Sequence, residues 1–167
     1  MAEAIATQDQ NSTMEQQIVV FDLAGETYGA DIHAVREIVR MQEITSIPQA
    51  PPAIEGVINL RGQVNPIMDL RKRFGLTASE ETKDSRIVVV DIGEQEVGLI
   101  VDAVAEVNRI PAEAIEAPSS VVTSPGTDYI SGIAKFEGSM IILLDLDKVL
   151  SATELSLMNE SIASSNS

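Results

Sequence analysis

Short apolar runs separated by turn residues dominate the first part of this chain and predict β-strands. Gln17-Ile-Val-Val-Phe-Asp22 is one such run, and a second follows the turn Ala24-Gly25-Glu26 at about 27–32. β-Branched side chains fit the pleated surface of a sheet, and glycine supplies the positive φ that a tight hairpin needs. We therefore predict a β-hairpin here, followed by a third strand near 36–42.

The same pattern returns in the second half of the chain. Arg86-Ile-Val-Val-Val-Asp91 matches the first run, and one constant spacing continues the match without a gap through both strands and the segment after them. That spacing pairs Gly29 with Gly98, Val35 with Val104, Glu37 with Glu106 and Arg40 with Arg109. A repeat of this kind predicts strands near 87–92, 96–101 and 104–110.

A second block also recurs, at a longer spacing. Residues 54–74 align with residues 130–150, and the recurring positions are Gly56 with Gly132, Gly62 with Gly138, Asp69 with Asp145 and Lys72 with Lys148. Each copy predicts a hairpin, 56–61 with 64–68 and 132–136 with 139–144, because a glycine interrupts two apolar runs. Asp69 and Asp145 follow these hairpins where an aspartate can cap a short helix.

The repeat predicts a mainly β fold with internal duplication. Short antiparallel strands protect their edges best by closing into a small barrel, so we expect two five-stranded barrels with short helices. The ordered domain is expected at 17–150, with strands of about 17–74 in one subdomain and 86–150 in the other. Polar, aperiodic ends predict a disordered tail at 1–16 and a C-terminal helix or tail at 151–167.

Composition removes several classes of function. The 167 residues carry 26 Asp and Glu against 11 Lys and Arg, and the net charge of -15 disfavours nucleic acid as a partner. With no cysteine and one histidine, the chain lacks a thiolate site, a disulfide framework and a multi-histidine metal site. No glycine-rich phosphate loop, cofactor motif, secretory signal or membrane-length apolar run is found. We expect a cytoplasmic protein without cofactor, membrane insertion or enzymatic activity.

Three features could carry binding, and each has a plainer alternative. Asn59-Leu60-Arg61-Gly62 is the least repeated part of the second block, so Arg61 could meet a carboxylate of a partner or form only a surface ion pair. The basic run Arg71-Lys72-Arg73 could bind an acidic partner, although balancing local carboxylates is the default. Val35 and Val104 could belong to an interface or to the core. His33 is expected in a surface turn.

At these residues the sequence resembles the CheW family of chemotaxis coupling proteins. The pattern begins at Tyr28-Gly29-x-Asp31-Ile32-x-x-Val35-x-Glu37-Ile38. It continues as Gly56-Val57-x-Asn59-Leu60-Arg61-Gly62-x-x-x-Pro66-Ile67-x-Asp69-Leu70-Arg71-x-Arg73-Phe74. The second half adds Gly98-x-x-Val101-Asp102-x-Val104, and the likeness covers about 17 to 150.

The resemblance implies two intertwined SH3-like barrels and a non-catalytic adaptor that joins chemoreceptor tips to the regulatory domain of the histidine kinase CheA. Apart from the resemblance, we expect a monomer in isolation. The receptor-binding residues that it implies are Val35, Glu37, Gly56, Arg61, Val104 and Val107. The kinase-binding residues that it implies are Val19 and Ile32. A paralogous coupling protein of another receptor and kinase array is the first alternative, and a small β-barrel ligand carrier is the second.

Overall fold

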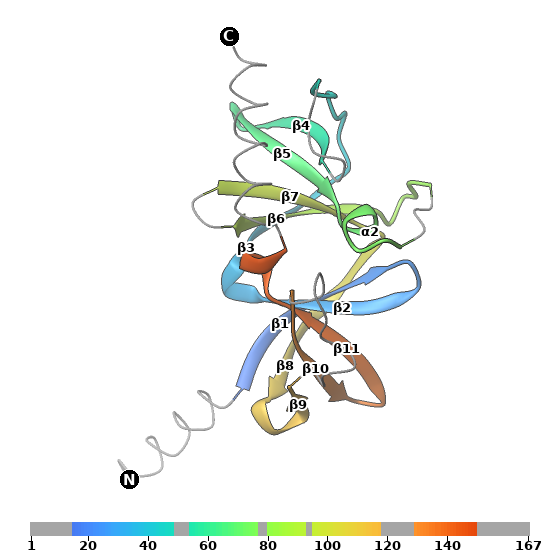
Figure 1. The fold of residues 1–167 in the computed structure, drawn as a ribbon, viewed down its shortest axis with the longest axis vertical. Coiled ribbons are helices and arrows are strands. Elements are labelled where there is room, and N and C mark those ends of the chain that lie inside the picture. The colour runs from blue at the N-terminus through green and yellow to red at the C-terminus, as the bar shows by residue number, and fades with distance from the viewer. Residues whose placement is uncertain (1–14, 49–53, 77–79, 93–94, 118–128, 150–167) are drawn as a thin grey trace, which may run out of the picture.

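The computed structural model describes residues 15–48, 54–76, 80–92, 95–117 and 129–149, and within them two β-sheets fill most of the molecule (Figure 1). The strands of the first half are β1 (Glu15–Leu23), β2 (Glu26–Asp31), β3 (Val35–Arg40), β4 (Ile54–Leu60) and β5 (Gln63–Asp69). Those of the second half are β6 (Arg86–Ile92), β7 (Gln95–Val101), β8 (Ala103–Pro111), β9 (Ile115–Glu116), β10 (Ile130–Phe136) and β11 (Ser139–Leu144). The short helices are η1 (Ile32–Ala34), α2 (Leu70–Arg73), η2 (Ala112–Ala114) and η3 (Leu146–Lys148). The mainly β fold and the predicted hairpins are confirmed. The predicted tail at 1–16 is too long by two residues, because Glu15 and Gln16 open β1, and its other residues lie outside the described ones, as do residues 151–167.

The two sheets do not follow the two halves of the sequence. One sheet has the order β8-β1-β2-β11-β10-β9, and the other has the order β3-β6-β7-β5-β4. Each half therefore gives its first hairpin, β1–β2 or β6–β7, to the sheet that holds the remaining strands of the other half, so that β3 pairs with β6 and β8 pairs with β1. This corrects the expected division at 17–74 and 86–150. The repeat could not reveal this exchange, because β1 and β6 are near-identical runs and either could accept the third strand.

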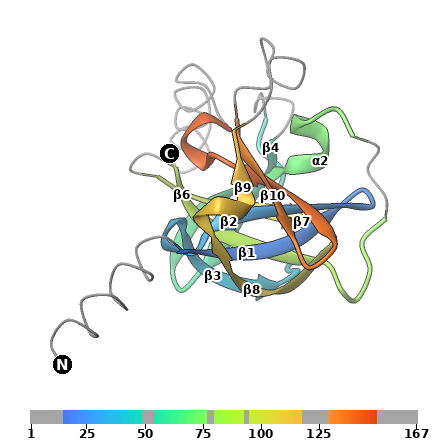
Figure 2. The same ribbon diagram turned by 90° about the horizontal axis from the view of Figure 1, so that it is seen from below.

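Both sheets close into barrels in the same way, through the chain that follows the third strand of each half. After β3, the chain bends so that Thr45 pairs with Val57 of β4 at the far edge of the five-stranded sheet. After β8, the chain bends through η2 so that β9 pairs with β10 at the far edge of the other sheet, which gives that sheet a sixth, two-residue strand. Figure 2 shows β8, β1 and β2 as neighbours in this second barrel. We call the two units the six-stranded barrel and the five-stranded barrel.

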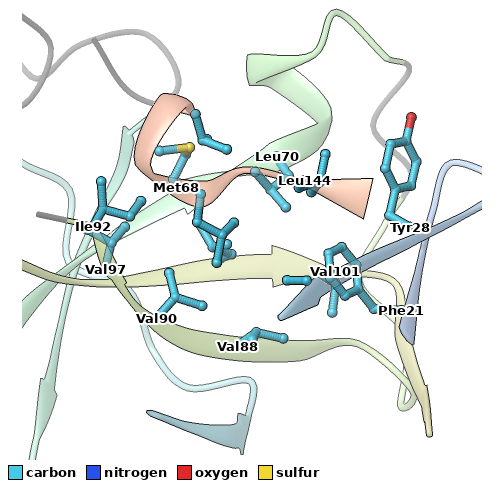
Figure 3. Packing of buried hydrophobic residues seen from close by; sticks show 14 of the residues in the cluster. Phe21, Tyr28, Met68, Leu70, Val88, Val90, Ile92, Val97, Val101 and Leu144 are labelled. Carbon is cyan, nitrogen blue, oxygen red and sulfur yellow. The ribbon is translucent and has the colours of Figure 1, made fainter. Parts of the chain in front are cut away.

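Three apolar clusters divide the core. Ile58, Ile67 and Ile87 lie in the cluster that fills the five-stranded barrel. Ile18 and Ile141 lie in the one that fills the six-stranded barrel. The largest cluster lies between the barrels, where side chains converge from both sheets (Figure 3), among them Phe21, Val90, Leu99 and Leu144. Because side chains occupy both interiors, the arrangement does not favour a ligand carrier.

The turns follow the backbone rules that the sequence suggested. Three hairpins have two consecutive residues at positive φ, as a type I′ turn requires, and these pairs are Ala24 and Gly25, Arg61 and Gly62, and Glu137 and Gly138. The side chain of Asp69 accepts a hydrogen bond from the Arg71 amide at 2.9 Å, and that of Asp145 accepts one from the Asp147 amide at 3.2 Å. Both predicted helix caps are confirmed.

Gly29 and Gly98 occupy equivalent places where a side chain has no room. A Cβ at Gly29 would lie 2.4 Å from Cγ2 of Ile18, and one at Gly98 would lie 2.5 Å from Cδ1 of Ile67. Because both barrels are tightly filled, we predict that Gly29→Ala and Gly98→Ala each destabilise the fold by about 1–3 kcal/mol. Urea unfolding followed by circular dichroism measures this. If Gly98→Ala were as stable as the parent, the neighbouring side chains could move to accept the added methyl group at no cost, contrary to the prediction.

Candidate partner-binding surface

Arg61 and Glu37 form an ion pair at one end of the five-stranded barrel. Arg61 lies in the turn between β4 and β5, and its Nη1 donates to Oε2 of Glu37 on β3 at 2.6 Å. This hydrogen bond, followed by the charge of Glu37, raises the pKa of Arg61 above its usual value. The Arg61 side chain is 70% exposed and that of Glu37 is 24% exposed. The pair therefore holds a guanidinium at the surface with one face open to a partner.

The contact with Arg61 uses only one carboxylate oxygen of Glu37. Its second oxygen, Oε1, is buried and has no hydrogen-bond partner within the described part of the chain. A backbone bulge between Val35 and Glu37 changes the register of β3 against β6 next to this residue. The structure therefore brings together two of the residues that the sequence assigned to receptor binding.

A second arginine stands beside this pair. Nε of Arg36, the residue within the bulge, lies 2.9 Å from Oδ2 of Asp91 and 3.8 Å from Oε2 of Glu96. The end of the five-stranded barrel thus holds two guanidinium groups among three carboxylates. We call this group of side chains the closed mouth.

Val35 and Val104 lie at the seam between the barrels. Val35 begins β3 in one sheet and Val104 belongs to β8 in the other, yet both are half-buried against the same shared core. The two alternatives of the sequence analysis are therefore not exclusive, because each side chain has one face in the core and one at the surface.

Gly56 and Val107 are placed differently from the other predicted receptor contacts. Gly56 is buried in a bulge of β4 at φ +153°, and the position of its missing Cβ is occupied by the Thr45 carbonyl. Val107 is 47% exposed on β8, directly opposite Val19 of β1. Gly56 can therefore contribute only through the backbone that it shapes, whereas Val107 offers an apolar surface.

The predicted kinase contacts differ in exposure. Ile32 is partly exposed in η1, whereas Val19 is only 1% exposed. A side chain so buried supports its strand and presents no surface of its own. Its register partner Val107 is the exposed apolar residue of that strand pair.

Sequence reasoning named Val107 but missed the symmetric set of exposed apolar side chains to which it belongs. Ile38 on β3 is 40% exposed, and Val107 takes its place in the second half. Val64 is 36% exposed, and its counterpart Met140 is 58% exposed. The repeat spacing could have found them, because it aligns apolar residues at strand positions that directly follow a polar residue.

The basic side chains of residues 71–73 make contacts within the molecule. Arg71 is buried, and its guanidinium contacts Asp69 and Asp102. Lys72 bonds to Glu55, and Nε of Arg73 donates to the Val149 carbonyl. The default interpretation, that this run balances local carboxylates, is confirmed for Arg71 and Lys72. His33 is 86% exposed beside Asp31, which confirms its surface position.

The described residues show neither a metal-binding cluster nor a spanning helix. Within the five described segments, no three His, Cys, Asp or Glu side chains are grouped so that they could hold a metal ion. Nor does any helix there have the length and apolar character needed to cross a membrane.

Comparisons with known proteins agree on the family. Residues 17–154 match the model of the CheW-like domain. The chain is 38% identical to the chemotaxis protein CheW of Treponema pallidum over 83% of this chain and 84% of that protein. It is 35% identical to the chemotaxis protein CheW of Klebsiella aerogenes over 88% and 89%. The crystal structure of the scaffolding protein TtCheW from Thermoanaerobacter tengcongensis superposes with a TM-score of 0.78 at 48% identity, covering 84% of this chain and 96% of that one. The chain therefore belongs to the CheW family.

Proposed function

We propose that this chain is a chemotaxis adaptor that couples chemoreceptors to the histidine kinase CheA and catalyses no reaction itself. Relatives of nearly the same length are named chemotaxis protein CheW, and the similar solved structure is named a scaffolding protein. The single observation that carries the proposal for the receptor is the exposed Arg61 guanidinium, which Glu37 holds in place at 2.6 Å.

Receptor contact is assigned to the side of the five-stranded barrel that includes Arg61. A guanidinium fixed by one carboxylate can still donate to a second one, and this gives orientation and discrimination in an interface. Val35 and Val104 at the seam and Val107 on β8 would add apolar area. Gly56 would hold the β4 backbone close to Thr45. In most protein interfaces a few residues contribute most of the binding free energy, and Arg61 is proposed to be such a residue here.

Kinase contact is assigned to the region of Ile32 and of the strand pair that contains Val19. Ile32 would touch the kinase directly. Val19 would act by positioning β1 against β8, where Val107 is exposed. Sharing a strand between the two surfaces would place receptor and kinase on one rigid body.

The proposed mechanism is positional. Holding a receptor and a kinase on the same scaffold raises their effective concentration, and it lets a small receptor movement shift the conformational equilibrium of the kinase. The shared core between the barrels supplies the rigidity that this needs, because its side chains come from both sheets.

Replacing Arg61 with alanine tests the receptor surface. We expect at least a tenfold loss of receptor affinity, equivalent to ~1.4 kcal/mol, because a charge-assisted contact is removed. Folding should persist, since Ala24 already occupies the same position of a type I′ turn at φ 49°. Co-sedimentation of the chain with receptor fragments in membranes measures the affinity, and circular dichroism checks the fold.

Lys135→Ala is the matched control, because Lys135 forms an exposed ion pair with Glu116 in the other barrel at 3.1 Å. This variant should bind the receptor like the parent. Equal affinity of Arg61→Ala and the parent would remove the role given to Arg61. A pull-down that recovers neither the receptor nor the kinase would contradict the adaptor function as a whole.

A further inference from the structure

The closed mouth has a counterpart at the same end of the six-stranded barrel. The repeat places Glu106 where the closed mouth has Glu37, and Asp22 where it has Asp91. The backbone agrees, because Glu106 pairs with Val20 after a bulge in the way that Glu37 pairs with Val89. Two of the three carboxylates that contact arginine in one barrel are thus retained in the other, whereas Thr27 stands in place of Glu96.

The two arginines themselves are not retained. Ala105 stands in place of Arg36, and Glu137 stands in place of Arg61 in an equivalent turn. The second mouth therefore keeps two acidic positions, loses both guanidinium groups and gains one further carboxylate. This is the divergence that the Asn59-Leu60-Arg61-Gly62 segment indicated in the sequence.

An open pocket of about 220 Å³ results at this second mouth. Asp22, Glu106 and Glu137 line it together with apolar Phe136 and Ile141. Within the described part of the chain, none of these three carboxylates takes part in an ion pair. We call this cavity the open mouth.

We propose that the open mouth receives an arginine side chain of a partner protein. The closed mouth supplies the template, since its equivalent carboxylates bind guanidinium groups at 2.6 Å and 2.9 Å. In the open mouth the partner's arginine takes the place that Arg61 and Arg36 fill internally. Three uncompensated carboxylates at the rim attract a cation, and the apolar wall accepts the methylene stem of the side chain.

The geometry favours arginine over a metal ion or lysine. The carboxylates of the open mouth are not among any described groups close enough to hold a metal ion. A guanidinium carries five donors in a plane, so it can bond to two carboxylates at once and stack on the Phe136 ring. An ammonium is a compact point charge that would satisfy fewer of these contacts.

A titration with small probes tests the site without the kinase or the receptor. N-acetyl-arginine amide and N-acetyl-lysine amide are each added to the ¹⁵N-labelled full chain while amide shifts are recorded. We expect the arginine probe to move the amides of Ala105, Glu106 and Glu137, and to bind at least roughly tenfold more tightly than the lysine probe. Glu106→Gln should weaken the arginine probe by a similar factor.

Glu137→Arg is designed to close the open mouth from within. It copies Arg61, so the new guanidinium should pair with Glu106 and abolish binding of the arginine probe while the remaining spectrum stays that of a folded protein. Glu113→Arg is the matched control, because it makes the same change of charge on exposed η2, whose residues do not line the cavity. It should leave binding unchanged.

Three results would overturn the proposal. One is the absence of shifts at the open mouth at the highest arginine concentration. Another is equal binding of the arginine and lysine probes. The third is equal weakening by Glu137→Arg and Glu113→Arg, which would show attraction to net charge alone. Because no receptor or kinase is present, each result stands apart from the test of the adaptor function.

Discussion

Replacing Arg71 with alanine is expected to destabilise the fold by about 3–5 kcal/mol, the range for removing one partner of a buried ion pair. Its guanidinium bonds to Asp69 at 3.0 Å and 3.1 Å and to Asp102 at 2.9 Å. Residue Asp69 is only 3% exposed, so the substitution leaves a buried carboxylate without its cation. The loss is a large fraction of the total stability of a small domain. Urea unfolding followed by circular dichroism measures it.

The effect should reach both barrels. Asp102 lies between β7 and β8, where one oxygen accepts from Arg71 and the other accepts from the Ala24 amide at 2.7 Å. Arg71 therefore connects the helix after β5 with the β1–β2 turn through a single carboxylate. We expect one cooperative transition at lower denaturant concentration, without separate melting of the two barrels.

Lys72→Ala is the matched control for this substitution. Lys72 is the next residue, and it bonds to Glu55 at 2.6 Å, but its side chain is 49% exposed. Exposed pairs contribute about 0–1 kcal/mol, so this variant should unfold close to the parent. If Arg71→Ala unfolded at the same denaturant concentration as Lys72→Ala, the buried network would have no special role in stability.

The parts of the fold that could be predicted are those fixed by neighbours in the sequence. A glycine after Ala24, Arg61 or Glu137 gives a two-residue turn, and an aspartate after a strand gives a helix cap. These features depend on local backbone geometry, so a pattern of a few residues contains all the necessary information. The two-barrel architecture followed because short strands in a duplicated chain need closure.

The exchange of the first hairpins, β1–β2 and β6–β7, between the two halves could not be predicted from the pattern. β3 would find a similar apolar edge on β1 or on β6, and local propensity is equal for both. Tertiary packing decides, since the chosen pairing allows Val35 and Val104 to pack against one shared core. Because the two copies have similar strands, the sequence alone does not show which strands pair between them.

The candidate site was predicted in part. The ion pair of Glu37 with Arg61 joins residues that are distant in the sequence, and no local pattern links them. The divergence of the Arg61 turn from its copy was visible, but its consequence depends on Arg36 and Glu137 at the same ends of the barrels. Only the structure shows that the carboxylates of one mouth are paired with arginines of the same chain and that the other mouth presents uncompensated carboxylates.

Duplication followed by divergence gives one scaffold two unlike surfaces. The paired turns and bulges keep the two backbones similar, while the change from Arg61 to Glu137 replaces a positive side chain with a negative one at equivalent turns. An adaptor benefits from this, because like-charged surfaces discourage the wrong partner as effectively as opposite charges attract the right one.

Replacing Gly56 with alanine should destabilise the protein by about 3–5 kcal/mol. A φ of +153° belongs to a region that is essentially restricted to glycine and costs other residues about 1–3 kcal/mol. The added Cβ would also lie 2.1 Å from the Thr45 carbonyl oxygen, so the two backbone hydrogen bonds between Thr45 and Val57, both 2.9 Å, would break. Each bond contributes about 0.5–1.5 kcal/mol, and together they close the five-stranded barrel. Urea unfolding measures the loss of stability, and receptor binding at a concentration that restores folding measures any separate effect.

Gly132→Ala is the internal control, because Gly132 is the counterpart of Gly56 but lacks a positive φ. A Cβ there would lie 3.1 Å from the Glu116 carbonyl oxygen, a tight contact that a shift of a few tenths of an ångström relieves. Its cost should be within about 1 kcal/mol, the usual size for a substitution that the backbone accommodates. Equal stability of Gly56→Ala and Gly132→Ala would contradict the argument from φ. Stable folding of Gly56→Ala with lost receptor binding would instead make Gly56 a direct contact.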